Sequence, residues 1–279
     1  GIVSIEGKDG SSVFVNPGEE VKVVASVLGA VPFSGWTLVK GGHFDESLLS
    51  SSEITFNVNC NVELVANFVR EFEVSKLESL QSAIKEAYPG DVIIVDDGEY
   101  VVPNEDNGLV VEKAITIKSK NGPQKTILKG GGDHRVITLK NSAWVEGFTI
   151  TGGKETFNDT TYTGYGSGAC IENSTLVNCI VSGNTCDNPD KKWGGGAVFL
   201  FNSGLVSGCI ISNNAAKGRS DGAGVTIFGG ILENSLIANC TCHTSDKAGG
   251  GIYAEGRAEV IIRNCTVVKN TAPTGEGGG

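Results

Sequence analysis

No stretch of this sequence is apolar for long enough to span a bilayer as a helix, and no run of Lys and Arg stands out. The 279 residues carry a formal net charge of −10 and give a pI near 4.9. These features disfavour a membrane span and a nucleic-acid partner. No signal peptide is recognisable within the sequence, and its last residues, Gly277 to Gly279, resemble the glycines that open each repeat. We therefore expect a natural protein that is longer than this chain.

What the sequence does contain is repetition after Tyr165. Four glycine-rich segments read alike: Gly166-Ser-Gly-Ala-Cys-Ile, Gly194-Gly-Gly-Ala-Val-Phe, Gly222-Ala-Gly-Val-Thr-Ile and Gly249-Gly-Gly-Ile-Tyr-Ala. Their last glycine recurs in steps of 28, 28 and 27 residues, at Gly168, Gly196, Gly224 and Gly251. A second motif alternates with the first: Asn178-Cys-Ile-Val, Gly208-Cys-Ile-Ile, Asn234-Ser-Leu-Ile and Asn264-Cys-Thr-Val. A constant period in this range predicts a solenoid.

Each repeat holds short β-rich runs bounded by Gly, Asn and Ser, with no helical periodicity. Coils built from strands and turns stack as a parallel β-helix, with rungs roughly 4.8 Å apart. Equivalent residues then form columns, which we interpret as packing. One interior column reads Phe148, Cys179, Cys209, Ser235 and Cys265, and an asparagine ladder reads Asn184, Asn214, Cys240 and Asn270.

These repeats resemble the bacterial right-handed parallel β-helix proteins of the pectate-lyase-like superfold. They are most similar to the Gly-rich repeats of polymorphic outer-membrane and other surface proteins. The resemblance covers about three quarters of the chain and implies the fold. It implies little about activity, because this superfold hosts lyases, hydrolases, adhesins and tailspikes.

Residues 1–69 are predicted to form a separate β module, and residues 70–279 the β-helix. Alternation marks strands at Val21–Ala25, Ile54–Val58 and Val62–Phe68. With Pro17-Gly18 and Gly35-Trp36, this order resembles the internalin-type B-repeat, a small β-grasp-like surface module. The resemblance implies a spacer or adhesive role without catalytic residues, and Trp36 is expected to lie in the module's core.

A linker over residues 70–75 is predicted to lead into one amphipathic helix at about 76–88. Its apolar positions are Leu77, Leu80, Ala83, Ile84 and Ala87, and Pro89-Gly90 ends it. We expect this helix to cap the open end of the β-helix, which would otherwise expose its core. The first rungs should follow at residues 91–95, 109–118, 126–128, 136–139 and 144–150.

The eight cysteines are expected to be reduced structural thiols. Cys179 and Cys209 lie on neighbouring rungs, but their column suits small apolar side chains. Cys186 and Cys242 are two rungs apart, which is too far for a disulfide. Cys240-Thr-Cys242-His243 has no matching pair elsewhere, so we expect no zinc site and no metal centre.

In a solenoid, insertions on one edge of successive rungs gather into one surface. Here these are residues 152–165, 186–193, 215–221 and 242–248. The candidate ligand-binding residues on them are Tyr162, Tyr165, Lys192, Trp193, Arg219, His243, Asp246 and Lys247. Aromatic rings can stack on sugars, while cations hold carboxylates or hydroxyls. The alternative is a surface salt-bridge ladder of Asp190 with Lys192, Asp221 with Arg219, and Asp246 with Lys247.

An enzyme would need more than such a surface. A β-helix lyase uses a Lys or Arg base and Ca²⁺ held by several carboxylates, and no cluster of three acids is placed for that. The Gly-His-Gly and Arg-Ile-Lys signatures of polygalacturonase-type hydrolases do not occur. The catalytic candidates are therefore weak: Asp190, Lys192, Arg219, Asp221 and Arg135. Asp133-His134-Arg135 is better explained as a polar turn before a strand.

These observations predict a monomeric, secreted or surface-displayed β-helix protein that binds polysaccharide or host glycan, without a resident cofactor. A polysaccharide lyase or hydrolase acting on a uronate polymer, with Ca²⁺ in the lyase case, remains the first alternative. A structural stalk is the second. Four N-glycosylation sequons begin at Asn158, Asn173, Asn239 and Asn264. The last two precede interior cysteines, which argues against their modification.

Overall fold

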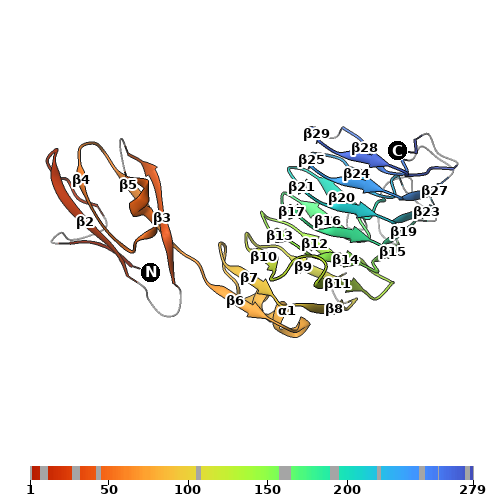
Figure 1. The fold of residues 1–279 in the computed structure, drawn as a ribbon, viewed down its shortest axis with the longest axis horizontal. Coiled ribbons are helices and arrows are strands. Elements are labelled where there is room, and N and C mark those ends of the chain that lie inside the picture. Colours follow the sequence, from red (N-terminus) through yellow and green to blue (C-terminus); the bar gives the residue numbers. More distant parts are fainter. Residues whose placement is uncertain are drawn as a thin grey trace. The chain divides into compact units, whose positions relative to one another are not determined.

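The computed structural model describes residues 2–6, 12–26, 32–41, 45–104, 108–156, 165–188, 195–218, 221–244, 249–256, 258–273 and 277–278. The chain divides into two compact units, Gly1–Glu71 and Phe72–Gly279, which are described separately (Figure 1).

The N-terminal unit is a small β module with two sheets. One sheet is antiparallel with the order β1 (Ile2–Ile5), β2 (Glu19–Ser26) and β4 (Glu53–Val58). The other pairs β3 (Phe33–Lys40) with β5 (Glu63–Phe68), and a short 3₁₀ helix spans Glu46–Ser50. Trp36 is buried and donates from Nε1 to the Ser51 carbonyl at 2.8 Å, which confirms it as a core residue.

The C-terminal unit is a solenoid whose strands form four parallel sheets (Figure 1). The first sheet contains β6 (Glu71–Val74), β7 (Val92–Val95), β10 (Thr116–Ser119), β13 (Trp144–Glu146), β17 (Thr175–Val177), β21 (Leu205–Ser207), β25 (Gly230–Glu233) and β29 (Val260–Arg263). The second contains β8 (Gly98–Val102), β11 (Thr126–Gly130), β14 (Thr149–Thr151), β18 (Ile180–Ser182), β22 (Ile210–Ser212), β26 (Leu236–Ala238) and β30 (Thr266–Val268).

The third sheet contains β9 (Leu109–Val111), β12 (Ile137–Leu139), β16 (Ala169–Glu172), β20 (Val198–Phe201), β24 (Val225–Ile227) and β28 (Ile252–Ala254). The fourth contains β15 (Lys154–Thr156), β19 (Thr185–Asn188), β23 (Ala215–Gly218) and β27 (Thr241–Thr244). Strands of one sheet come from successive rungs, so the predicted fold class, a parallel β-helix with one helix and a small β module, is confirmed.

The predicted interior column is confirmed by the strand register. The pairing of β14, β18, β22, β26 and β30 brings the residues just before them into line. The Phe148 N–H donates to Cys179 Sγ at 3.4 Å, and the Cys209 N–H donates to Ser235 Oγ at 3.1 Å. Phe148, Cys179 and Cys209 are at most 1% exposed. Small polarizable thiols therefore fill a narrow interior.

The asparagine ladder is also present. Asn214 Oδ1 accepts from the backbone N–H of Asn184 at 3.0 Å, and Asn214 Nδ2 donates to the Val181 carbonyl at 2.9 Å. Two rungs beyond Asn214, Asn270 Oδ1 accepts from the Cys240 N–H at 2.9 Å. Each buried amide thus satisfies backbone groups of the neighbouring rungs, which is why it stays polar inside a core.

The glycine spacing does not give the register at every rung. Val198 pairs with both Ala169 and Val225, so the residue in line with Gly168 is Ala197, not Gly196. Residues in line on successive rungs of the third sheet are therefore 29, 27 and 27 positions apart. This corrects the spacing of 28, 28 and 27 that the glycines suggest. Gly196 has a φ of 77°, which a glycine adopts without strain.

The second sequence motif marks a corner between the first and second sheets. Gly147, Asn178, Gly208, Asn234 and Asn264 all have φ between 51° and 79°. Only Gly and, at modest cost, Asn enter this left-handed region routinely. The alternation of Asn and Gly in the motif therefore reflects one bend that is repeated on every rung.

The predicted cap is helix α1 (Leu77–Glu86), which buries Leu80, Ala83 and Ile84 against the start of the solenoid. Lys113 Nζ donates to the carbonyls of Ile84, Lys85 and Ala87 at 3.0, 2.6 and 2.9 Å. These are orphan acceptors at the helix C-terminus, where a cation is favourable.

The predicted linker needs one correction. Residues 71–74 form β6, the edge strand of the first sheet beside β7. The Asp96 N–H donates to the Val74 carbonyl at 2.9 Å. This segment reads as a linker because its alternation spans only four residues, fewer than the pattern needs to stand out.

Candidate functional site

The segments that we expected to be loops on one edge of the solenoid begin with the strands of the fourth sheet. This corrects the expectation of loops over residues 152–165, 186–193, 215–221 and 242–248, since β15, β19, β23 and β27 take up part of each. The inner positions of these strands, Cys186, Ala216 and Cys242, are fully buried. They pack with Cys170, Phe199 and Phe228 in a second core between the third and fourth sheets.

Tyr165 belongs to this second core. Its ring is 8% exposed and lies 4.6 Å, centroid to centroid, from Phe199. Phe199 in turn meets Phe228 edge to face at 5.2 Å. A ring buried among aromatic side chains offers no platform for a sugar, so Tyr165 leaves the candidate ligand-binding set.

Arg135 and Asp221 are also buried, at 3% and 7% exposure. Arg135 donates from Nε to the Gly166 carbonyl at 2.9 Å and from Nη1 to Thr138 Oγ1 at 3.0 Å. These contacts fix the guanidinium between adjacent rungs. The Arg135 side chain therefore holds adjacent rungs together instead of reaching solvent. Arg219, the partner expected for Asp221, lies outside the described residues.

His134 has a structural position too. Its ring is 2% exposed, with Nε2 at 2.9 Å from the Val102 carbonyl and Nδ1 beside an Asp133 carboxylate oxygen. The buried histidine thus bridges the rungs of β8 and β12, in agreement with a polar turn before a strand.

Two columns of side chains point outward from the fourth sheet, and we call them the fourth-sheet face. In one, Lys154, Thr185, Ala215 and Thr241 are register partners, and Thr271 Oγ1 donates to Thr241 Oγ1 at 3.0 Å. In the other, Asp187, Lys217 and His243 lie on successive rungs. Lys217 and His243 are exposed and Asp187 is half-buried.

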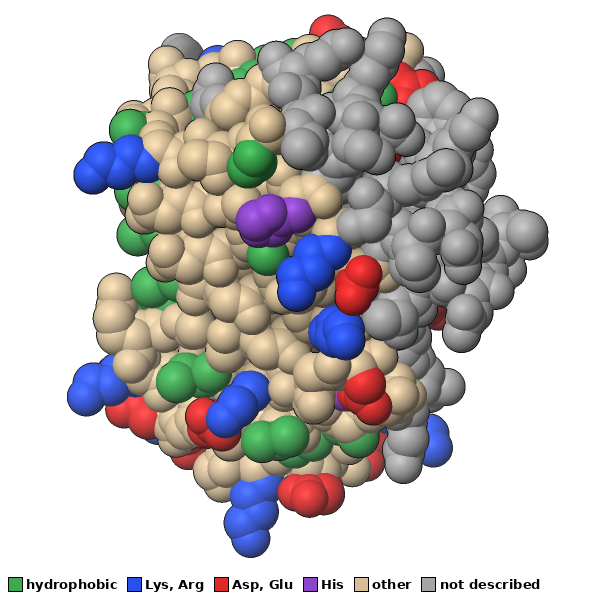
Figure 2. Space-filling view, turned by 90° about the vertical axis from the view of Figure 1, so that its right-hand side faces the viewer, with side chains coloured by type: hydrophobic (Ala, Val, Ile, Leu, Met, Phe, Trp, Pro, Cys, Tyr) green, Lys and Arg blue, Asp and Glu red, His purple; other side chains and the backbone are tan. Residues whose placement is uncertain are grey.

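This face presents charge and hydroxyl groups at a regular spacing. Parallel neighbours lie roughly 4.8 Å apart, so Asp187, Lys217 and His243 form a straight row along the solenoid axis. Figure 2 shows Lys or Arg and Asp or Glu side chains below a histidine on this side of the molecule. Such a row can hydrogen-bond an extended polymer at several points without enclosing it.

The remaining candidate residues lie outside the described part of the chain. They are Tyr162, Asp190, Lys192, Trp193, Arg219, Asp246 and Lys247. Of the predicted ligand-binding set, His243 is the described residue that reaches solvent. Lys154 and Asp187 were missed as candidates because the strand register, not the sequence pattern, places them on the same face as His243.

Six of the eight cysteines, Cys170, Cys179, Cys186, Cys209, Cys240 and Cys242, have buried side chains. Burial raises the pKa of Cys179 and of Cys240 above the ordinary range of a thiol. Both therefore stay protonated near neutral pH and are poor nucleophiles and metal ligands. Among the described residues, no group of three or more His, Cys, Asp and Glu side chains could hold a metal ion.

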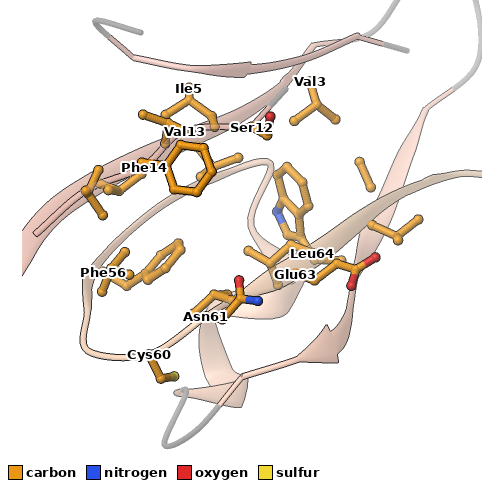
Figure 3. A pocket seen from close by; sticks show the side chains of 18 of the residues that line it. Val3, Ile5, Ser12, Val13, Phe14, Phe56, Cys60, Asn61, Glu63 and Leu64 are labelled. Atoms are coloured by element: carbon orange, nitrogen blue, oxygen red, sulfur yellow. The ribbon is translucent and has the colours of Figure 1, made fainter. Parts of the chain in front are cut away.

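The N-terminal module carries an apolar hollow of its own. It measures about 1150 Å³ and lies between the two sheets of the module (Figure 3). Its lining includes Ile5, Trp36, Phe56 and Leu64, with Glu63 and Asn61 at the edge where β5 begins. The hollow is open to solvent, since its lining also includes the exposed residues Phe14 and Cys60.

Stacked parallel rungs with polar outer faces define a solenoid of the β-helix class. A family model described as the right-handed β-helix region matches residues 130–278, more than half of the chain. The chain therefore belongs to the right-handed β-helix family.

A cell surface glycoprotein of Methanothermus fervidus is 34% identical over 119 residues, which are 41% of this chain. The chain covers 18% of that relative's length. An alginate lyase of the PL6 family superposes with a TM-score of 0.36 at 12% identity, over 73% of this chain and 39% of the lyase. An alginate lyase from Paenibacillus sp. FPU-7 superposes with a TM-score of 0.26 at 14% identity, over 73% of this chain and 99% of that chain. Superpositions this weak support no inference about activity.

The described chain has one α-helix of 10 residues, and no helix in it is long and apolar enough to cross a bilayer.

Proposed function

We propose that this chain is part of a cell-surface protein that binds polysaccharide on its fourth-sheet face. The similarity to a cell surface glycoprotein supports the location. The observation that supports binding is the in-register row of Asp187, Lys217 and His243 on the outside of a parallel sheet.

The chemistry of the face favours an acidic polymer. Lys154 and Lys217 provide cations on the same sheet, while Asp187 contributes one carboxylate. The hydroxyls of Thr185 and Thr241 between them can donate to or accept from sugar hydroxyls. Each contact at an exposed site is weak, so affinity must come from many rungs binding one chain and must fall with salt.

The direct test is calorimetric titration with oligogalacturonate and with a neutral oligoglucan of similar length. We expect saturable binding of the acidic oligosaccharide that weakens at least threefold in Lys217→Ala and in His243→Ala. Lys129→Ala is the matched control, since Lys129 is an exposed lysine on β11 of the second sheet. Equal losses in all three variants, or no binding by the wild type, would contradict the proposed face.

The enzyme alternative predicts a different result in the same mixture. A lyase would release an unsaturated product, which absorbs in the ultraviolet. Asp221 and Arg135 are buried, Arg135 hydrogen-bonds within the fold, and the row on the fourth-sheet face has a single carboxylate. This arrangement favours binding without turnover, and steady growth of ultraviolet absorbance would favour the enzyme instead.

A further inference from the structure

Asparagines repeat at the corners of the rungs in a backbone conformation that turns their side chains outward. Eight of them in the described structure have φ between 46° and 57°: Asn141, Asn173, Asn178, Asn202, Asn213, Asn234, Asn239 and Asn264. After glycine, asparagine is among the residues that enter this conformation most readily, although Ser142 and Lys269 adopt it here too. The corner therefore explains why asparagine is frequent here, but not how each side chain is used.

Four of the eight corner amides use their nitrogen within the fold. Asn178 Nδ2 donates to Glu146 Oε1 at 3.2 Å, and Asn202 Nδ2 donates to Glu172 Oε1 at 3.1 Å. Asn141 Nδ2 donates to the Glu112 carbonyl at 3.2 Å, and Asn213 Nδ2 donates to Ser212 Oγ at 3.3 Å. None of these four begins an Asn-x-Ser/Thr sequence.

The other corner amides behave differently. Asn173, Asn239 and Asn264 are exposed, and their Nδ2 atoms donate no hydrogen bond within the described structure. Asn173 uses only its oxygen, which accepts from the Ser203 N–H at 3.2 Å. All three begin a sequon, completed by Thr175, Thr241 and Thr266. Asn234 also has an uncommitted nitrogen, but Leu236 occupies the third position.

We propose that Asn173, Asn239 and Asn264 carry N-linked glycans. The side-chain nitrogen attacks the anomeric carbon of a lipid-phosphate-activated oligosaccharide, forms the N-glycosidic bond, and loses one proton. The bond from that carbon to the phosphate oxygen breaks, so the lipid phosphate leaves. The proposal rests on the proposed surface location only because such donors are supplied during export.

The neighbouring residue sets the time of modification. Ser174 and Cys240 are 3% and 0% exposed, so a transferase cannot hold those sequons extended once the rung has closed. The glycan must be added before that rung folds. The fold then accommodates the product, because the modified nitrogen faces solvent while the next side chain turns inward. This reverses the expectation that an interior cysteine argues against modification at Asn239 and Asn264.

The structure also separates these sites from the other described corners. A glycan on Asn178 or Asn202 would crowd an amide nitrogen that already donates to a glutamate on the preceding rung, whereas the Asn239 nitrogen has no such contact. The fourth sequon, at Asn158, lies outside the described residues.

The test is glycopeptide mass spectrometry of the protein purified from the envelope of the cells that naturally produce it. We expect glycan on the peptides containing Asn173, Asn239 and Asn264, removable by an amidase that leaves aspartate behind. Peptides containing Asn178 and Asn202 should have their unmodified mass. Glycan on fewer than two of the three predicted asparagines would overturn the proposal.

Sequon variants produced in the same cells separate a loss of glycosylation from a failure to fold. Thr241→Val and Thr266→Val should each lower the intact mass by one glycan, while Thr266→Ser keeps it. Asn178→Gln, at a corner without a sequon, should leave the glycan mass unchanged. An unchanged glycan mass in both valine variants would contradict attachment at these sites. If the wild-type protein binds no polysaccharide while the variants show these mass shifts, the proposed function is refuted and the glycosylation proposal is supported.

Discussion

The two units of this chain bury apolar side chains in different ways. In the solenoid, inward side chains such as Leu176, Val206 and Ile237 are fully buried, because each rung is covered by the next. In the N-terminal module, six apolar residues of the described part are buried and others, including Phe56 and Leu64, are only partly buried around a hollow of about 1150 Å³. A stacked repeat closes its core by adding rungs, whereas two small facing sheets must fill the space between them with side chains.

The largest expected effect comes from making the same substitution, Leu→Ala, in both units and comparing the loss of stability. Leu176→Ala should destabilise the solenoid by about 2–5 kcal/mol, because a tightly packed site cannot collapse around the cavity. Leu64→Ala should destabilise the module by only about 1 kcal/mol, since Leu64 is half-buried and already lines a hollow. Chemical denaturation, followed for each unit's transition, measures both, and equal losses would contradict the difference in packing.

The asparagine ladder gives the next effect. Asn214→Ala removes the acceptor of the Asn184 N–H and the donor to the Val181 carbonyl, and leaves both groups buried. We expect a loss of roughly 2–3 kcal/mol in the solenoid transition. Asn213→Gly is the control on the adjacent exposed corner, where glycine fits the backbone, and it should be near neutral. A loss at residue 214 no greater than at residue 213 would show that the ladder contributes nothing.

A smaller effect tests the corners. Asn178→Val places a β-branched residue at a φ of 53° and should cost about 1–2 kcal/mol. Asn178→Gly should cost less, because Gly147 and Gly208 occupy the same corner on neighbouring rungs. Thermal unfolding of the two variants gives the comparison. If valine were tolerated as well as glycine, the corner would not be what selects Asn and Gly.

The smallest effect is electrostatic and lies on the outside of the first sheet. Hydrogen bonds from Arg263 and Ser207 lower the pKa of Glu233 below its ordinary value. Because the folded pKa is the lower one, the stabilisation is present above the unfolded pKa, near 4.5, and is lost as pH falls through the folded value. Wild type should therefore exceed Glu233→Gln in stability at pH 7, and the two should converge in acid. A gap that persists below the folded pKa would rule out the charge as its cause.

Sequence periodicity predicts the solenoid, its cap and its interior columns, because these depend on residue type at fixed spacing. It cannot give the register where a rung gains or loses one residue, as at Gly168 and Ala197. It reads β6 as a linker because four residues carry too little pattern. The second core was missed for a related reason. Tyr165 lies in a polar, glycine-rich segment, and only the pairing of the third and fourth sheets shows that its ring is enclosed.

The site follows the same rule. His243 could be chosen from sequence because it stands among polar residues in an insertion. Its neighbours Asp187 and Lys217 are 56 and 26 positions away in the sequence. The parallel pairing of β19, β23 and β27 places the three residues in one row. The proposed glycan binding on this face therefore depends on the stacking of rungs, not on any local motif.

Amide hydrogen exchange with and without oligogalacturonate tests that claim most directly. Slower exchange on binding is expected in β19, β23 and β27 together, with no change in β17, β21 and β25 of the first sheet. Protection confined to the first sheet, or to a single rung, would contradict a binding face made from the stacked strands of the fourth.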